Sequence, residues 1–115
     1  MIIKNSERVS DLRHELRGGK GDIKFTEVLP ESMLAGKGRL FSVMTVEPGC
    51  SVGAHDHNGE AEIYFVLKGK LQGDDNGTPV VLEPGDVMYT GGGAYHSVEN
   101  LENEPAEVLA VILFD

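Results

Sequence analysis

Short apolar runs separated by turn residues dominate the chain after Gly21. Six such runs are rich in β-branched and aromatic residues: Ile23–Val28, Arg39–Val46, Ile63–Leu67, Val80–Leu82, Val87–Thr90 and Val108–Phe114. Pairs such as Pro48-Gly49 and Pro84-Gly85 lie between them and are typical of turns. Many short strands without intervening helices predict an all-β fold, built as an antiparallel sandwich or barrel.

One of these turns predicts a specific hairpin. Asn76-Gly77 follows Asp74-Asp75 and precedes the run Val80–Leu82. A type I′ turn needs positive φ at both of its central residues, and Asn followed by Gly is the pair that adopts it most readily. We therefore expect a tight two-residue β-turn at this point.

The N-terminal segment has a different spacing of apolar residues. Val9, Leu12 and Leu16 recur at roughly helical intervals, and Gly18 offers a C-terminal stop. This pattern predicts a short helix or an ordered arm over residues 1–21. A β-barrel would then occupy residues 22–115, with the whole chain forming one structural domain.

Composition and charge exclude several classes of partner. The 115 residues carry a formal net charge of −9, so a nucleic acid or an anionic membrane surface would be repelled. No apolar stretch has the length of a membrane span, and the N-terminus turns polar too early for a secretory signal. A cytoplasmic location is expected. Cys50 is the single cysteine, which excludes an intrachain disulfide and favours a semi-buried packing role.

A His-x-His pair is the first indication of chemistry. His55 and His57 are two residues apart, so their side chains point the same way in an extended backbone, while Asp56 should face away. Glu62 follows on the next predicted strand, where it shares a face with Tyr64. Two imidazoles beside a carboxylate indicate a metal site that needs further ligands from elsewhere in the chain.

The third imidazole is expected from His96. It follows a Gly-rich turn after the run Val87–Thr90, and this turn could return the side chain to the barrel interior. His14 lies in the N-terminal segment and is interpreted as a surface residue. Three histidines and a glutamate in one dry interior would be costly to bury without a shared partner.

The spacing of these residues resembles the two motifs of the cupin superfamily. The first motif is matched by Gly49, His55, His57, Glu62 and Gly69, and the second by Gly85, Gly91, Gly93, His96 and Asn100. One position departs, because the family usually has proline where Gly91 stands, and this loop loses the fixed φ of that residue. The chain is most similar to small bacterial single-domain cupins.

The resemblance implies a jelly-roll barrel that holds one divalent metal ion through His55, His57, Glu62 and His96. Manganese or iron is expected from the ligand types, with zinc, nickel or cobalt as alternatives. An octahedral ion would keep two neighbouring positions open for a bidentate oxygen ligand. A tetrahedral zinc ion would be closed by the four side chains and would be structural.

Several functions remain open at this point. The metal could bind a hydroxy acid, keto acid, sugar or polyol. The protein would then be a lyase, decarboxylase, isomerase or dioxygenase, or a non-catalytic carbohydrate- or metabolite-binding module. A structural closed-zinc barrel is the third alternative. Candidates for proton transfer are Glu60, Tyr64, Tyr89 and Tyr95, although Glu60 also fits a solvated turn and the tyrosines fit packing roles.

Two further expectations concern the ligand charge and the assembly. Acidic residues near the barrel rim should disfavour a dianion such as oxalate; they are Asp56, Glu60, Asp74 and Asp75. Small jelly rolls leave exposed sheet edges, and the N-terminal arm could cover the edge of a neighbouring copy. A homodimer is therefore expected.

Overall fold

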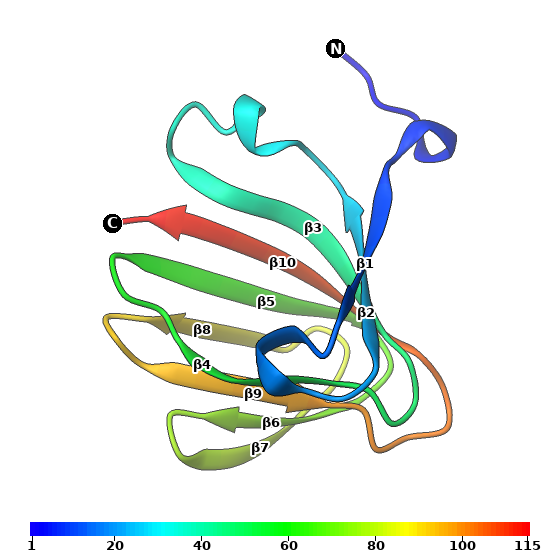
Figure 1. Cartoon of the computed structure of the whole chain (residues 1–115), viewed down its shortest axis with the longest axis vertical. Coiled ribbons are helices and arrows are strands. Elements are labelled where there is room, and N and C mark those ends of the chain that lie inside the picture. Colours follow the sequence, from blue (N-terminus) through cyan, green and yellow to red (C-terminus); the bar gives the residue numbers. More distant parts are fainter.

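Two antiparallel β-sheets face each other and enclose the core (Figure 1). The computed structural model describes all 115 residues. The larger sheet has the strand order β1-β2-β3-β10-β5-β8. Its strands are β1 (Ser10–His14), β2 (Asp22–Glu27), β3 (Gly38–Val46), β10 (Ala106–Phe114), β5 (Glu60–Lys68) and β8 (Val87–Gly91).

The smaller sheet has the order β4-β9-β6-β7. Its strands are β4 (Ser51–Asp56), β9 (Tyr95–Glu99), β6 (Leu71–Asp75) and β7 (Thr78–Leu82). The helical content is three short turns, η1 (Asn5–Glu7), η2 (Leu16–Gly18) and η3 (Glu31–Met33). None of these turns has the length or apolar content that a membrane span requires. The all-β jelly-roll prediction is confirmed, and each of the six expected runs falls on a strand.

Of the two alternatives for the N-terminal segment, the short helix was wrong and the ordered arm is confirmed, because residues 10–14 form the edge strand β1. This strand pairs with β2 in antiparallel register, from Ser10 opposite Thr26 to His14 opposite Asp22. Val9 and Leu12, whose spacing suggested a helix, are both 66% exposed. Sheet pairing, rather than burial of an apolar helical stripe, therefore organises this segment. His14 is exposed, as expected, and its Nδ1 lies 2.7 Å from Asp22 Oδ1.

The core is formed by side chains that alternate along the strands of both sheets. On β10 the residues alternate between buried and half-buried positions from Ala106 to Ile112, as the two-residue period of a strand requires. Tyr64, Met44 and Ile23 are among the largest buried side chains. Cys50 packs against this core from a half-buried position, which agrees with its predicted role.

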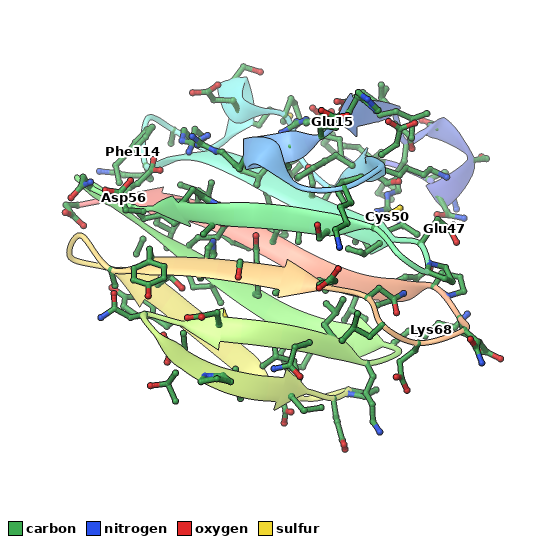
Figure 2. All side chains as sticks on the ribbon, turned by 60° about the horizontal axis from the view of Figure 1, so that its bottom comes forward. Glu15, Glu47, Cys50, Asp56, Lys68 and Phe114 are labelled. Atoms are coloured by element: carbon green, nitrogen blue, oxygen red, sulfur yellow. The ribbon has the colours of Figure 1, made fainter.

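The loops divide between the two ends of the barrel (Figure 2). Asp56 and Phe114 mark one end, and Glu47 and Lys68 mark the other. Asn100 connects two segments at the end marked by Glu47 and Lys68. Its buried side-chain amide donates hydrogen bonds to the carbonyl oxygens of Val46 and Glu104, each at 2.8 Å. This motif residue therefore holds loops together and takes no part in the metal cluster.

The predicted hairpin at Asn76-Gly77 is confirmed. These residues join β6 to β7 and have φ values of 50° and 98°. We expect Gly77→Ala to lower the free energy of unfolding by about 1 kcal/mol, because a Cβ is strained at this φ. The added Cβ would also lie 3.2 Å from the hydroxyl oxygen of Tyr95. Urea denaturation would measure the change.

A neighbouring substitution serves as the control for the turn. Asp75→Ala alters an exposed side chain that precedes the positive-φ pair, and it should change the free energy of unfolding by less than about 0.5 kcal/mol. Equal denaturation curves for Gly77→Ala and Asp75→Ala would contradict the role assigned to the turn.

Candidate metal centre

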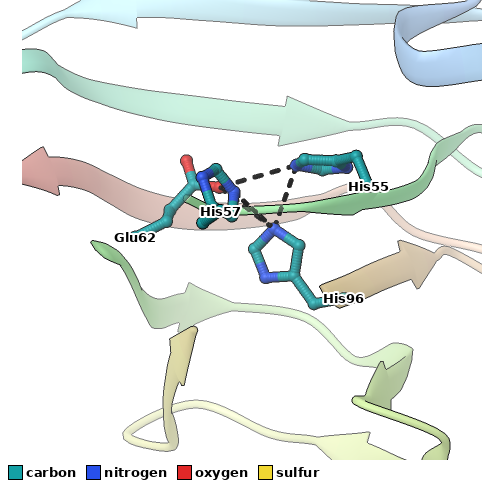
Figure 3. A group of neighbouring side chains, drawn as sticks. All are labelled: His55, His57, Glu62 and His96. Carbon is teal, nitrogen blue, oxygen red and sulfur yellow. Dashed lines mark hydrogen bonds and ion pairs between the residues drawn. The ribbon is translucent and has the colours of Figure 1, made fainter. Parts of the chain in front are cut away.

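Four side chains from both sheets converge in the barrel interior (Figure 3). His55 lies on β4 and His57 follows directly after that strand, while His96 lies on the adjacent strand β9 opposite His55 in register. Glu62 approaches from β5 in the other sheet. The structure thus brings together the four residues that the sequence predicted as ligands. Figure 3 shows the ring nitrogens and the carboxylate pointing toward one another.

The donor atoms lie at distances that suit coordination of one ion. Glu62 Oε1 is 3.0 Å from His57 Nε2, 3.1 Å from His96 Nε2 and 3.9 Å from His55 Nε2. His96 Nε2 is 3.2 Å from His57 Nε2 and 3.1 Å from His55 Nε2. Adjacent ligands on an ion with bonds of about 2.1 Å are separated by about 3.0 Å in an octahedron.

The second nitrogen of each ring has its own hydrogen-bond partner. His55 Nδ1 donates to the carbonyl oxygen of Gly53 at 2.7 Å, and His57 Nδ1 donates to Glu60 Oε1 at 2.9 Å. His96 Nδ1 is hydrogen-bonded to Thr90 Oγ1 at 2.8 Å. A partner on Nδ1 orients the ring and leaves Nε2 free to coordinate, which is the usual arrangement of a metal-ligating histidine.

The chemistry of this donor set suits a shared cation. Carbonyl and carboxylate oxygens only accept hydrogen bonds, so the Nδ1 atoms of His55 and His57 carry protons. In the neutral rings the Nε2 atoms then present lone pairs toward the acceptor oxygen of Glu62. Lone pairs at such distances repel each other unless a proton or a metal ion lies between them. The cluster therefore suits a single divalent metal ion.

Burial and hydrogen bonds shift the pKa values inside the cluster in opposite directions. Burial alone would raise the pKa of Glu62, but the three histidines around its carboxylate outweigh burial and hold that pKa well below its usual range. The nearby carboxylate of Glu62, followed by the hydrogen-bonded carboxylate of Glu60, raises the pKa of His57. Burial lowers the pKa of His96. Glu62 is thus anionic throughout the physiological range.

Glu60 is not a solvated turn residue, because it forms the outer partner of His57. Its carboxylate also receives two hydrogen bonds from the Arg39 guanidinium, both at 2.7 Å, and its side chain is only 14% exposed. Arg39 first, and then His57, lower the pKa of Glu60 to about 2. A carboxylate held ionised in this way positions the ring and is a poor proton donor.

The three tyrosine candidates lie in different environments. Tyr64 stacks on the ring of His96, with centroids 4.7 Å apart, and is fully buried. Its burial, reinforced by the charge of Glu62, raises its pKa well above 10. Tyr89 lies between the buried residues Met88 and Thr90, and Tyr95 precedes the buried His96. Both tyrosines therefore face outward and are exposed. Neither reaches the metal cluster.

A small cavity of about 60 Å³ lies beside the cluster. Its lining includes His55, His57, Glu62 and three cations, Arg13, Arg17 and Arg39. The four acidic residues expected at the rim do not line it, so the premise of the predicted bias against a dianion is not met at this cavity. The N-terminal segment supplies two of the arginines, and their approach depends on the pairing of β1 with β2.

Sequence reasoning missed the outer partners of the histidines and the cavity arginines. One signal was present, since Glu60 has the same strand parity as Glu62 and Tyr64 and should share their inward face. A weaker signal was present for Thr90, which lies two residues after Met88 on β8 and so shares its inward face. Nothing local in the sequence indicates that Arg13 or Arg17 approaches the cluster.

Comparison with known proteins places this architecture among its relatives. Residues 42–112 match the family described as Cupin domain. The chain is also 42% identical over 113 residues to a Thermotoga maritima protein named "Oxalate-binding protein", covering 98% of this chain and 93% of the relative.

Solved structures give the same result. A Thermotoga maritima protein described as a "predicted oxalate decarboxylase" superposes with a TM-score of 0.95 at 41% identity, covering 100% of both chains. A sugar phosphate isomerase of the cupin superfamily from Silicibacter pomeroyi has a TM-score of 0.70 at 22% identity, covering 81% of this chain and 60% of that one. The second likeness concerns the fold alone.

Proposed function

This chain belongs to the cupin family, and on that premise we propose that it binds a small dicarboxylate at one divalent metal ion. The observation that carries the proposal is the convergence of three Nε2 atoms and one carboxylate beside a cavity lined by arginines. His55, His57, Glu62 and His96 would hold the ion. The bound ion would supply Lewis acidity and open coordination positions for ligand oxygens.

The donor distances favour an octahedral ion. Four of the five donor pairs with measured separations are 3.0 to 3.2 Å apart, as expected for adjacent octahedral ligands, whereas His55 Nε2 and Glu62 Oε1 are 3.9 Å apart. A tetrahedral ion with the same bond lengths would place all pairs at about 3.4 Å. This unequal pattern supports manganese or iron, admits nickel or cobalt, and disfavours a closed zinc site.

Cavity size and charge support a compact anion. A volume of about 60 Å³ has room for only a few water molecules, which is too little for a sugar ring. Three arginines favour a negative ligand, and guanidinium groups match carboxylates in geometry. Oxalate fits these conditions, and the name of the Thermotoga maritima relative points to the same ligand. Sugars and polyols are disfavoured.

The residues around the cavity support binding rather than turnover. Decarboxylation of oxalate releases carbon dioxide and needs a proton for the remaining carbon, which becomes formate. Glu60 is held ionised by Arg39, and the pKa of Tyr64 lies far above neutrality, so neither supplies a proton readily. Apart from the proposed metal ligands, the charged residues that line the cavity are arginines, which do not release protons in proteins.

Calorimetry with oxalate tests this proposal. Protein loaded with manganese should bind one oxalate per chain, and the same protein stripped with a chelator should bind it at least about 30-fold more weakly, since the metal supplies two ligand contacts. Carbon-13 NMR of labelled oxalate should show no formate after prolonged incubation. Equal binding by the metal-free protein would contradict the metal-dependent site, and formate production would contradict a purely binding role.

Metal occupancy should fall on acidification. Coordination needs neutral imidazoles, so metal binding is complete above the histidine pKa values and is lost as the pH falls through them. We expect release to begin around pH 6 and to be complete by about pH 4. Metal content after equilibration at each pH would measure this. Unchanged occupancy at pH 4 would contradict histidine ligation.

The assembly is proposed to be a homodimer. The outer edge of β1 has no strand partner, and the apolar residues Met1, Ile2, Val9 and Leu12 beside it are exposed. A second copy covering this edge would bury them. Light scattering at micromolar concentration should give twice the chain mass of 12.4 kDa. A monomer mass at that concentration would contradict the dimer.

A further inference from the structure

We propose that Arg17 binds the outer carboxylate of the ligand and thereby selects dicarboxylates over monocarboxylates. This inference rests on the proposed function, because it assumes that one end of the ligand lies at the metal. Arg17 belongs to the turn η2 and lines the same cavity as His55, His57 and Glu62. It is therefore a candidate specificity residue outside both cupin motifs.

Arg17 is the one cavity arginine without a carboxylate partner. Arg13 Nε lies 3.0 Å from Asp11 Oδ2, and its guanidinium stacks 3.8 Å above the ring of Phe25. Arg39 is held by both oxygens of Glu60. No carboxylate oxygen lies within 4 Å of the Arg17 guanidinium, whose donors are thus available to a ligand.

The backbone holds Arg17 in an uncommon conformation. Its φ is 56° and that of Glu15 is 48°, both in the left-handed region that non-glycine residues rarely adopt. Such conformations persist where surrounding contacts impose them, and they are frequent at functional sites. In this turn the contacts are backbone hydrogen bonds, from Glu15 N to Gly21 O at 2.8 Å and from Gly18 N to Glu15 O at 2.9 Å.

Two glycines bring this turn directly onto β4. A Cβ at Gly53 would lie 2.0 Å from the carbonyl oxygen of Arg17, and a Cβ at Gly19 would lie 2.1 Å from that of Ser51. Ser51 N also donates to the carbonyl oxygen of Lys20 at 2.9 Å. In Figure 1 the turn lies against β4. The backbone of Arg17 is therefore fixed beside the strand that carries His55.

Gly53 links the two halves of the site. Its carbonyl oxygen accepts the hydrogen bond that orients His55, and its missing side chain leaves space for the backbone of Arg17. The position of the Arg17 backbone relative to His55 is thus constrained at Gly53. Such a rigid arrangement suits recognition of a ligand of fixed length.

Charge balance explains why Arg17 would distinguish ligands. A divalent ion with Glu62 and three neutral imidazoles leaves one net positive charge. A monocarboxylate neutralises that charge by itself, whereas a dicarboxylate leaves one negative charge in excess. The guanidinium of Arg17 would compensate it with charge-assisted hydrogen bonds. Because Arg17 is exposed to solvent, we expect a contribution of no more than about tenfold in affinity.

Calorimetry on manganese-loaded variants tests this assignment, with oxalate and glycolate as the two probes. Glycolate can also bind a metal through two oxygens, but it carries one negative charge. Arg17→Gln should weaken oxalate binding about tenfold and glycolate binding less than about twofold. Arg17→Lys keeps the charge without the planar fork and should give an intermediate loss for oxalate.

Lys20→Gln provides the matched control, because Lys20 lies on the same segment but pairs with Glu99 outside the cavity. It should leave both affinities within about twofold of the wild type. Metal content and circular dichroism of each variant would verify that the centre and fold are intact. Equal loss for both probes in Arg17→Gln, or no loss for oxalate, would overturn the assignment. Failure of the wild type to bind oxalate would instead overturn the proposed function.

Discussion

Glu62→Gln should reduce the metal content of the purified protein from about one ion per chain to below about 0.1. The amide keeps nearly the same size as the carboxylate but removes the one negative charge among the four ligands. It would also leave three imidazoles without an anionic partner at 3.0 to 3.9 Å. We expect the affinity for manganese to fall at least about 100-fold, beyond the range for loss of an outer partner. Elemental analysis and chelator competition would measure the change.

Glu47→Gln is the control for this experiment. Glu47 lies at the opposite end of the barrel (Figure 2), so the substitution removes the same charge without touching the cluster. Glu62→Gln should still fold in the absence of metal, since a buried charged group without its cation contributes little to stability. Equal metal content in Glu62→Gln and the wild type would contradict the role of this carboxylate.

Glu60→Gln should lower metal affinity by about 10- to 100-fold without removing a ligand. In the wild type, His57 Nδ1 donates a hydrogen bond to the ionised Glu60 Oε1 at 2.9 Å, and the substitution weakens this bond by removing the charge of the acceptor. The ring of His57 then becomes a poorer donor and is less firmly oriented. Chelator competition would measure the affinity, and the absorption spectrum of the cobalt-loaded protein should shift because the ligand environment changes.

Arg39→Gln removes the cation that pairs with the carboxylate of Glu60 and leaves that carboxylate in place. Without Arg39 the pKa of Glu60 should rise from about 2 toward the ordinary value of 4.5, which still leaves it ionised at pH 7. The hydrogen bond to His57 therefore survives, and the loss of metal affinity should be smaller than in Glu60→Gln. A larger loss in Arg39→Gln would indicate that the arginine, rather than the carboxylate, supports the centre.

The ligand set could be predicted because local rules determine it. Side chains two residues apart point the same way on a strand, which joins His55 to His57 and places Glu62 on the face of Tyr64. The cupin spacing then supplied His96. These constraints act within one strand or one turn, and the structure brings the four side chains together accordingly.

The surroundings of the cluster depend on long-range pairing and could not be predicted in the same way. Val9, Leu12 and Leu16 have helical spacing, but β2 offers a free edge that captures residues 10–14 as a strand. That pairing carries Arg13 and Arg17 to the cavity and reverses the charge expected there. The rim was judged from acidic residues near the motifs, whereas two of the three cavity arginines came from a segment about 40 residues earlier in the chain.

A crystal structure of the protein grown with manganese, with anomalous data collected near the manganese edge, would test the central claim most directly. We expect one peak about 2.0 to 2.3 Å from the Nε2 atoms of His55, His57 and His96 and from a carboxylate oxygen of Glu62. Two further oxygen ligands should face the cavity of Arg13, Arg17 and Arg39. A peak elsewhere, or an ion closed by four protein ligands with no open position, would contradict it.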